Sequence, residues 1–169
     1  MGFQFPLRLL GLLALVALIQ GVSAQQALIG KVTRITDGDT LVIVDAAHKE
    51  HRIRIAGIDA PEKGQGFSEA SRQSLARMAF GKQSTAFCYK WSYQRRVCNV
   101  FVGNTDIGLE QVRAGMAWHY KQFEREQAEN DRIQYAIAEV QARSARLGLW
   151  SQRDPVAPWN WRRRGVTKQ

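Results

Sequence analysis

Three short runs rich in β-branched residues lie close together near the start of the chain, and they constrain its fold most strongly. They span residues 28–35, 40–45 and 51–58, and turn-forming residues bound them. The dipeptide Asp37-Gly38, which is typical of a tight turn, separates the first two runs. A short stretch at 46–50 separates the second from the third. This spacing predicts three consecutive antiparallel strands.

The third run shows which side of that sheet is buried. Ile53 and Ile55 alternate with Arg52 and Arg54. Because side chains on a strand alternate between its two faces, the isoleucines share one face and the arginines share the other. Arg54 is therefore predicted to point away from the isoleucine face.

The middle of the chain predicts a helix and then two more strands. Ser68 is a candidate N-cap for a helix that Gly81 ends, and residues 84–91 and 95–102 predict a hairpin. With the first three strands, this makes a five-stranded barrel of the oligonucleotide-binding (OB) kind, with one helix inserted after the third strand.

Two further helices are predicted after the barrel strands. A short helix ends near Gly115, and a longer one covers 124–147. The chain is thus expected to be an α+β protein with about three helices, whose domain spans residues 25–151.

Both ends of the chain differ in composition from this domain. Residues 1–24 have a basic residue, an apolar run and small residues before Gln25, which predicts a secretory signal peptide, with a buried apolar helix as the alternative. Residues 152–169 contain Trp159 and Trp161, candidates for packing back on the domain, and a run of arginines at 162–164. Proline and charge in this tail argue against another core element.

The charge of the chain favours an anionic partner. It has 24 Lys and Arg against 15 Asp and Glu, for a formal net charge of +9. Nucleic acid is favoured over anionic lipid, because no Lys/Arg-rich amphipathic helix stands out. The other explanation is that the positive charge serves only to keep the protein soluble.

Cys88 and Cys98 are the two cysteines of the chain. Their spacing suits two strands of a hairpin, and an exported protein meets oxidising conditions. A disulfide and two buried free thiols both remain open.

Two segments that carry carboxylates lie about twenty residues apart, at 37–40 and 54–62. Carboxylate oxygens are ligands for a hard divalent cation, and the basic surroundings attract a polyanion with further oxygens. Asp37-Gly38-Asp39 by itself is better explained by a plain hairpin turn. Taken together, the two segments favour phosphodiester chemistry.

The order of the motifs resembles the staphylococcal nuclease (thermonuclease) family. Asp-Gly-Asp-Thr at 37–40 is followed by Arg54, by Asp-Ala-Pro-Glu at 59–62, by Tyr-Gln-Arg at 93–95 and by Val-Arg-Ala-Gly at 112–115. The likeness runs from about Gly30 to Trp150, and several spaced motifs in one order are more specific than any single motif.

The resemblance implies a calcium ion held by the side chains of Asp39 and Asp59 and the main-chain carbonyl of Ala60. The family more commonly has threonine at the position of Ala60, a change that a backbone ligand tolerates. So few protein ligands leave room for waters and a substrate phosphate. Glu62 matches the glutamate that positions or deprotonates the attacking water.

The resemblance also implies the groups that bind substrate. Arg54 and Arg95 match two arginines that grip the scissile phosphate, although each alone is also explained as a solvated surface residue. Tyr93 belongs to the same motif as Arg95. Tyr120 falls where the family has aromatics that stack on a nucleobase, and a core or rim role is equally open.

This chain departs from the family pattern in the turn that carries the second arginine. Gln94 stands where the family usually has glycine, and it lacks glycine's backbone freedom. Arg96 is therefore the alternative to Arg95.

The function implied is an exported, calcium-dependent nuclease that cleaves DNA, with RNA as a further candidate substrate, has low sequence specificity and leaves 3′-phosphate ends. A monomer in the periplasm or outside the cell, without stable membrane association, is expected. One alternative is a non-catalytic OB-fold protein that binds single-stranded nucleic acid. Another is metal-free ribonuclease chemistry with His119 as acid or base.

Overall fold

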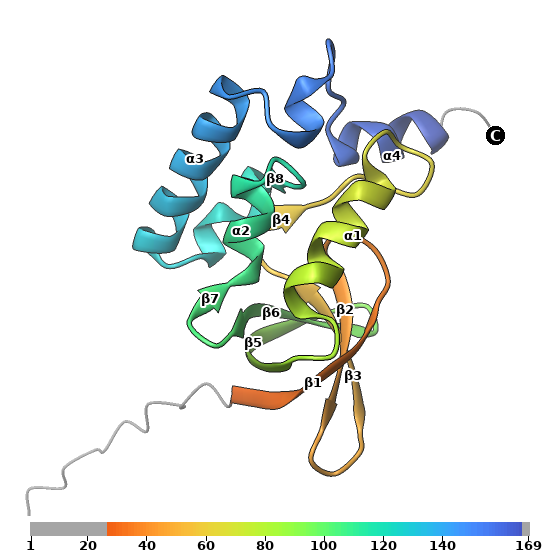
Figure 1. Cartoon of the computed structure of the whole chain (residues 1–169), viewed down its shortest axis with the longest axis vertical. Helices are drawn as coiled ribbons and strands as arrows, with labels where there is room; N and C mark the ends of the chain where they lie inside the picture. The colour runs from red at the N-terminus through yellow and green to blue at the C-terminus, as the bar shows by residue number, and fades with distance from the viewer. Residues whose placement is uncertain (1–26, 167–169) are drawn as a thin grey trace, which may run out of the picture.

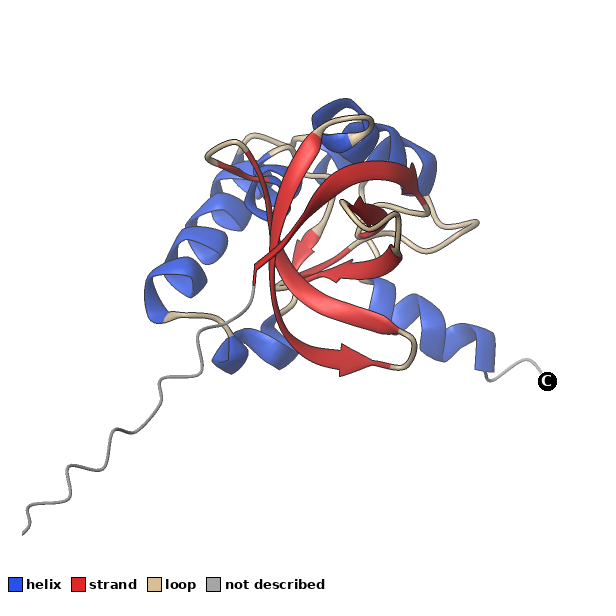
Figure 2. Cartoon of the chain, turned by 90° about the horizontal axis from the view of Figure 1, so that it is seen from below, coloured by secondary structure: helices blue, strands red, loops and turns tan. Residues whose placement is uncertain are grey.

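A closed barrel with helices packed around it forms the centre of the computed structural model, which describes residues 27–166 (Figure 1, Figure 2). Its long strands are β1 (Ala27–Ile35), β2 (Thr40–Asp45), β3 (Glu50–Ile55), β5 (Gln83–Ser92) and β6 (Arg95–Val102). β1, β2 and β3 form the predicted antiparallel meander, β5 pairs with β1, and β6 runs parallel to β3 and closes the barrel. The predicted OB-type barrel of the α+β class is confirmed.

The shorter elements surround this barrel. They are β4 (Ile58–Asp59), α1 (Ser68–Ala79), β7 (Thr105–Asp106), α2 (Ile107–Arg113), β8 (Trp118–His119), η1 (Lys121–Glu126), α3 (Glu129–Ser144), η2 (Gly148–Ser151) and α4 (Pro158–Val166).

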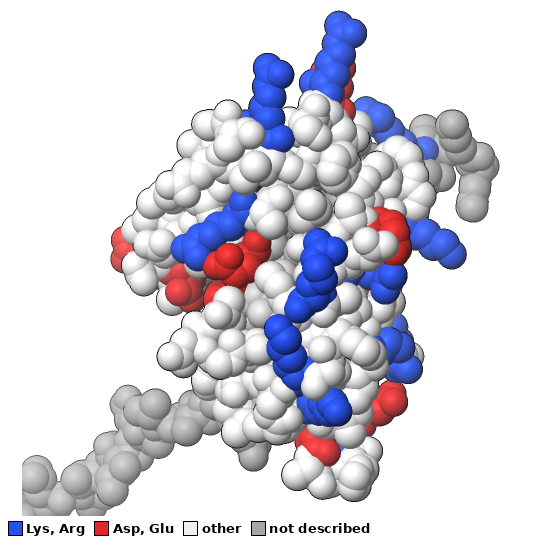
Figure 3. Space-filling view, viewed as in Figure 1, with Lys and Arg blue, Asp and Glu red and all other residues white. Residues whose placement is uncertain are grey.

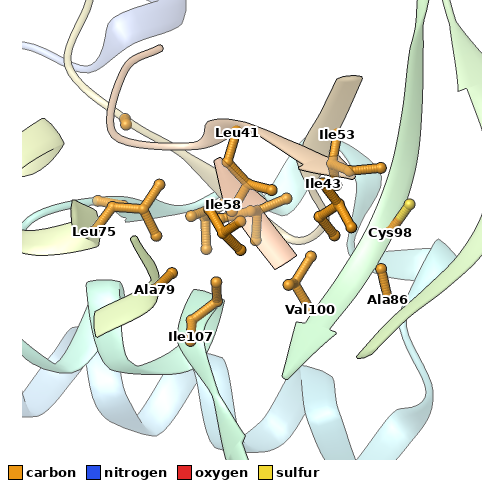
Figure 4. Packing of buried hydrophobic residues seen from close by; sticks show 14 of the residues in the cluster. Leu41, Ile43, Ile53, Ile58, Leu75, Ala79, Ala86, Cys98, Val100 and Ile107 are labelled. Carbon is orange, nitrogen blue, oxygen red and sulfur yellow. The ribbon is translucent and has the colours of Figure 1, made fainter. Parts of the chain in front are cut away.

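The core fills the barrel and the space beneath α1 and α2 (Figure 4). Leu41, Ile43 and Ile53 are fully buried, and Leu75 and Ala79 reach them from α1. On β3 the isoleucines are buried while Arg52 is exposed, so the predicted alternation is confirmed. Arg54 therefore leaves the barrel wall on the outer side.

The third strand is shorter than predicted. β3 ends at Ile55, and Gly57, with φ +72°, turns the chain before β4, which pairs with β8. A Cβ at Gly57 would lie 2.3 Å from the side-chain nitrogen of Gln127, so both backbone conformation and space favour glycine here. This bend separates Asp59 from the strand that carries Arg54.

Two of the helix predictions are wrong. The segment 124–147 is not one helix, because the chain is extended at Gln127 between η1 and α3. Ser68 does not cap α1: the residue before the helix is Phe67, with φ +68°, and no side chain caps this end.

The tail contributes a core element, contrary to expectation. Pro158 starts α4, a position where proline's fixed φ suits a helix. Ala157 is buried beside it, and the Trp159 ring packs 5.5 Å from that of Trp118. The apolar area of Trp159 outweighs the charge that follows it, whereas Trp161 stays partly exposed.

Cys88 and Cys98 form a disulfide between directly opposed positions of β5 and β6. Of the two alternatives left open by the sequence, the bridge is therefore the one observed. The predicted signal peptide, residues 1–24, lies outside the described residues.

Candidate active site

A cavity of about 540 Å³ opens beside the barrel. The loop after β1, the segment from β3 through Glu62, the tip of the β5–β6 hairpin and η1 enclose it. Every residue that the sequence proposed for the site lines this cavity: Asp39, Arg54, Asp59, Ala60, Glu62, Tyr93, Arg95 and Tyr120. The motifs thus converge in space although they are far apart in sequence.

Arg54 joins the two acidic segments. Its Nη1 lies 2.9 Å from Asp39 Oδ2, and its Nη2 lies 2.9 Å from Asp59 Oδ1. The same guanidinium donates to the carbonyl of Ile58 at 2.9 Å. One planar group therefore fixes both carboxylates on the same side of the cavity, a geometry that lysine cannot reproduce.

The loop that carries Asp39 is closely packed against the loop that carries Ala60. The Ala60 amide donates to Asp39 Oδ2 at 2.9 Å. A Cβ added at Gly38 would lie 1.9 Å from Ser71 Oγ, so glycine permits this close approach. The Gly38 carbonyl in turn accepts from the buried amide of Gln111 at 2.8 Å. These contacts bring the Ala60 backbone next to the Asp39 carboxylate.

Burial makes the acidic groups of this cavity costly to ionise. Burial raises the pKa of Asp37 to about 6, and the nearby Asp39 charge adds to the effect. Burial also raises the pKa of Asp59, although its partners Arg162 and Arg54 oppose the shift. Carboxylates crowded in this way favour a bound cation.

Glu62 stands at the rim, held by the loop that follows it and by α4. Its amide donates to the Gln65 side chain at 3.0 Å, and the Gln65 amide group donates to the carbonyl of Val156, just before α4. Its Oε1 lies 2.5 Å from Arg162 Nη1. The side chain of Glu62 is 39% exposed, so water can reach it.

Arg162 is the site residue that the sequence reasoning missed. From α4, its Nη2 lies 2.8 Å from Asp59 Oδ2, and its Nη1 contacts both Asp59 and Glu62. The hydrogen bond to Asp59 is the main cause of a raised pKa at Arg162. The available signal was the position of Arg162, three residues after the anchoring Trp159 and hence one helical turn further along.

The hairpin tip places its two arginines on opposite sides of β6. Arg95 lines the cavity and donates to Thr40 Oγ1 at 3.2 Å, whereas Arg96 lines a different cavity. The structure therefore places Arg95, and not Arg96, with Arg54. The positive φ of this turn, +54°, falls on Tyr93 rather than on Gln94, so the absence of glycine at 94 does not disturb it.

The aromatic side chains lie at the rim of the cavity. Tyr93 is 95% exposed at the hairpin tip. Tyr120 stacks on Trp159 with ring centres 5.4 Å apart, and it meets Phe123 edge to face. Tyr120 is thus a rim residue whose ring borders the same cavity as Arg54 and Arg95.

His119 does not line the cavity. It is buried in β8, where its ring pairs with the Gln127 side chain at 2.8 Å and burial lowers its pKa. This position does not support metal-free chemistry with His119 as acid or base.

The donors available to a metal are oxygens. Within residues 27–166, no three or more His, Cys, Asp or Glu side chains are arranged as a complete metal-binding set. Asp39, Asp59 and the Ala60 backbone would supply a partial set, which suits a hard cation that also binds water and phosphate. Two arginines now pair with these carboxylates, and a cation has to compete with them.

The cavity is lined by charges of both signs, whereas the chain as a whole is basic, with a formal net charge of +9. Figure 3 shows lysine and arginine side chains spread over one face of the molecule, with fewer acidic ones among them. A carboxylate cluster beside paired arginines, in a basic OB barrel, defines a hydrolase site for phosphate esters.

Comparison with known proteins gives the family. The model of the staphylococcal nuclease homologue family matches residues 52–152. An "uncharacterized endonuclease" of Haemophilus influenzae is 38% identical over 134 residues, which cover 79% of this chain and 72% of that protein. A "micrococcal nuclease" of Shigella flexneri is 36% identical over 160 residues, 89% of each chain. The chain belongs to the staphylococcal nuclease family and is a nuclease.

In the described part of the chain, none of the helices combines the length and the apolar character required to cross a bilayer.

Proposed function

We propose that this chain is an exported, calcium-dependent nuclease that hydrolyses DNA and RNA with low sequence specificity and leaves 3′-phosphate ends. The observation that carries the proposal is the Arg54 guanidinium, which holds Asp39 and Asp59 in one cavity with Glu62 and Arg95. Export is supported by the apolar run preceded by Arg8 and by the Cys88–Cys98 bridge, which forms under oxidising conditions.

Asp39, Asp59 and the Ala60 carbonyl would hold the calcium ion. When bound, the ion polarises the scissile phosphate and neutralises part of its charge. The arginines next to these ligands neutralise the remaining negative charge of the phosphate.

Glu62 takes the proton from the attacking water or orients it. Its partly exposed carboxylate stands at the rim, within reach of solvent and beside the acidic cluster. Attack in line on phosphorus then expels the 5′ oxygen and leaves the phosphate on the 3′ side.

Arg54 and Arg95 bind the phosphate oxygens as negative charge builds on them. Arg54 sits deep in the site, with only 15% of its side chain exposed. Its donors are already oriented by backbone carbonyls and carboxylates, so little reorganisation is needed during the reaction. Contacts of this kind read the backbone and not the bases, which fits low sequence specificity.

The test is cleavage of single- and double-stranded DNA and RNA with calcium, with magnesium and with a calcium chelator. We expect cutting of DNA and RNA with calcium, loss of cutting with the chelator, and 3′-phosphate ends by end-group analysis. Cutting that persists in the chelator contradicts the calcium requirement, and 5′-phosphate ends contradict the bond assigned to break. Sedimentation of the same sample tests the expected monomer.

A further inference from the structure

A second cavity, of about 650 Å³, lies at one mouth of the barrel. The start of β1, the turn between β2 and β3, and the strands β5 and β6 surround it. Mouths of β-barrels are frequent ligand sites. None of the residues proposed for hydrolysis lines this cavity.

The wall of this cavity combines an exposed aromatic ring with a cation. Trp91 and Arg96 are directly paired across the β5–β6 hairpin, and the Arg96 guanidinium lies 5.2 Å from the Trp91 ring centre. Trp91 remains 65% exposed. An indole with a free surface beside a guanidinium offers stacking to a base and charge to its phosphate.

Among residues 27–166, the Arg96 side chain has no hydrogen-bond or ion-pair partner. Its Nε is buried without a hydrogen bond, and its guanidinium makes no ion pair with another residue in the described range 27–166. The acidic side chain in this cavity, Asp45, is engaged by His51 at 2.7 Å. An anionic oxygen would satisfy Arg96, whereas an apolar protein surface would bury it unpaired at a cost in free energy.

The two cavities lie on opposite sides of the β5–β6 hairpin and meet along β5. Tyr89 and Lys90 line both of them. The pairing of β5 with β6 shifts between Cys88 and Lys90, and beyond this bulge Trp91 faces the second cavity while Ser92 faces the first. A strand bound at Arg95 therefore reaches Trp91 and Arg96 by passing over one edge of the hairpin.

We propose that the barrel mouth is a second nucleotide-binding site for the substrate strand. It holds a nucleotide outside the cleavage position, with the base on Trp91 and a phosphate on Arg96. The inference rests on the proposed function, because the occupant is the same nucleic acid. It adds a binding determinant that only substrates longer than the cleaved dinucleotide can use.

Substrate length tests this site. Steady-state kinetics are measured on a dinucleotide and on a single-stranded 12-mer with Trp91→Ala, Arg96→Ala and the control Phe80→Ala. Phe80 is 57% exposed and lines neither cavity. We expect Trp91→Ala and Arg96→Ala to raise KM for the 12-mer about tenfold, the scale of one lost stacking or phosphate contact, with kcat and dinucleotide cleavage unchanged.

Equal changes for both substrates, or none for either, would overturn the second site. If no substrate is cleaved, the hydrolytic proposal fails, and anisotropy with a labelled 12-mer still tests the barrel mouth by the same variants. A dimer that Trp91→Ala dissociates, with unchanged 12-mer binding, would make this surface a contact between copies of the chain and refute the nucleotide site.

Discussion

Arg162 provides the sharpest test of the carboxylate site, through its effect on calcium affinity. Its guanidinium contacts Asp59 at 2.8 Å and Glu62 at 2.5 Å, where it opposes any cation bound by Asp59. We predict that Arg162→Ala binds calcium more tightly than the unaltered protein does.

The magnitude follows from Coulomb's law. The Arg162 side chain is 42% exposed, so a dielectric constant close to that of water applies to its interactions. A unit charge and a doubly charged ion about 5 Å apart repel by roughly 1 to 2 kcal/mol in water. This corresponds to calcium binding about fivefold to thirtyfold tighter.

Isothermal titration calorimetry at physiological ionic strength measures this change without relying on activity. Arg163→Ala is the matched control, because it removes the same charge from the same helix and Arg163 does not line the cavity. Arg162→Lys keeps the charge and is expected to show a smaller gain. Unchanged or weaker calcium binding in folded Arg162→Ala would refute the competition for Asp59.

Two further predictions concern catalysis and stability. Glu62→Gln and Arg54→Ala should each lower kcat at least about a hundredfold, the usual scale for a general base or a charge-stabilising donor, as measured by oligonucleotide cleavage. Near-normal turnover in folded variants would remove these residues from the mechanism. Replacing both Cys88 and Cys98 with serine should lower the free energy of unfolding by about 2 to 3 kcal/mol in urea titrations, because the bridge closes a short loop. An unchanged urea midpoint would contradict that account.

The barrel was predictable because its strands carry their own signals. Alternation at Ile53 and Ile55 and the turn at Asp37-Gly38 are local features, and period-two burial follows from strand geometry alone. The site residues came from the order of motifs. Their convergence is a property of the barrel, whose closure brings β3 beside β6.

The errors have a common physical origin, which is tertiary contact. The break at Gln127 coincides with a hydrogen bond to the buried His119, and no local pattern reveals that partner. In the same way, α4 is specified by tryptophan packing against residues some forty positions earlier, which outweighs its charge. Arg162 was missed because its partners lie about a hundred residues away.

The disulfide of the hairpin has a consequence for which arginine serves the phosphate. In a strand, sliding the pairing by one residue would exchange the sides on which Arg95 and Arg96 emerge. The covalent tie between Cys88 and Cys98, only three positions from Arg95, blocks such a slip. In the oxidised protein, the disulfide thus determines before substrate binds that Arg95, and not Arg96, faces the active-site cavity.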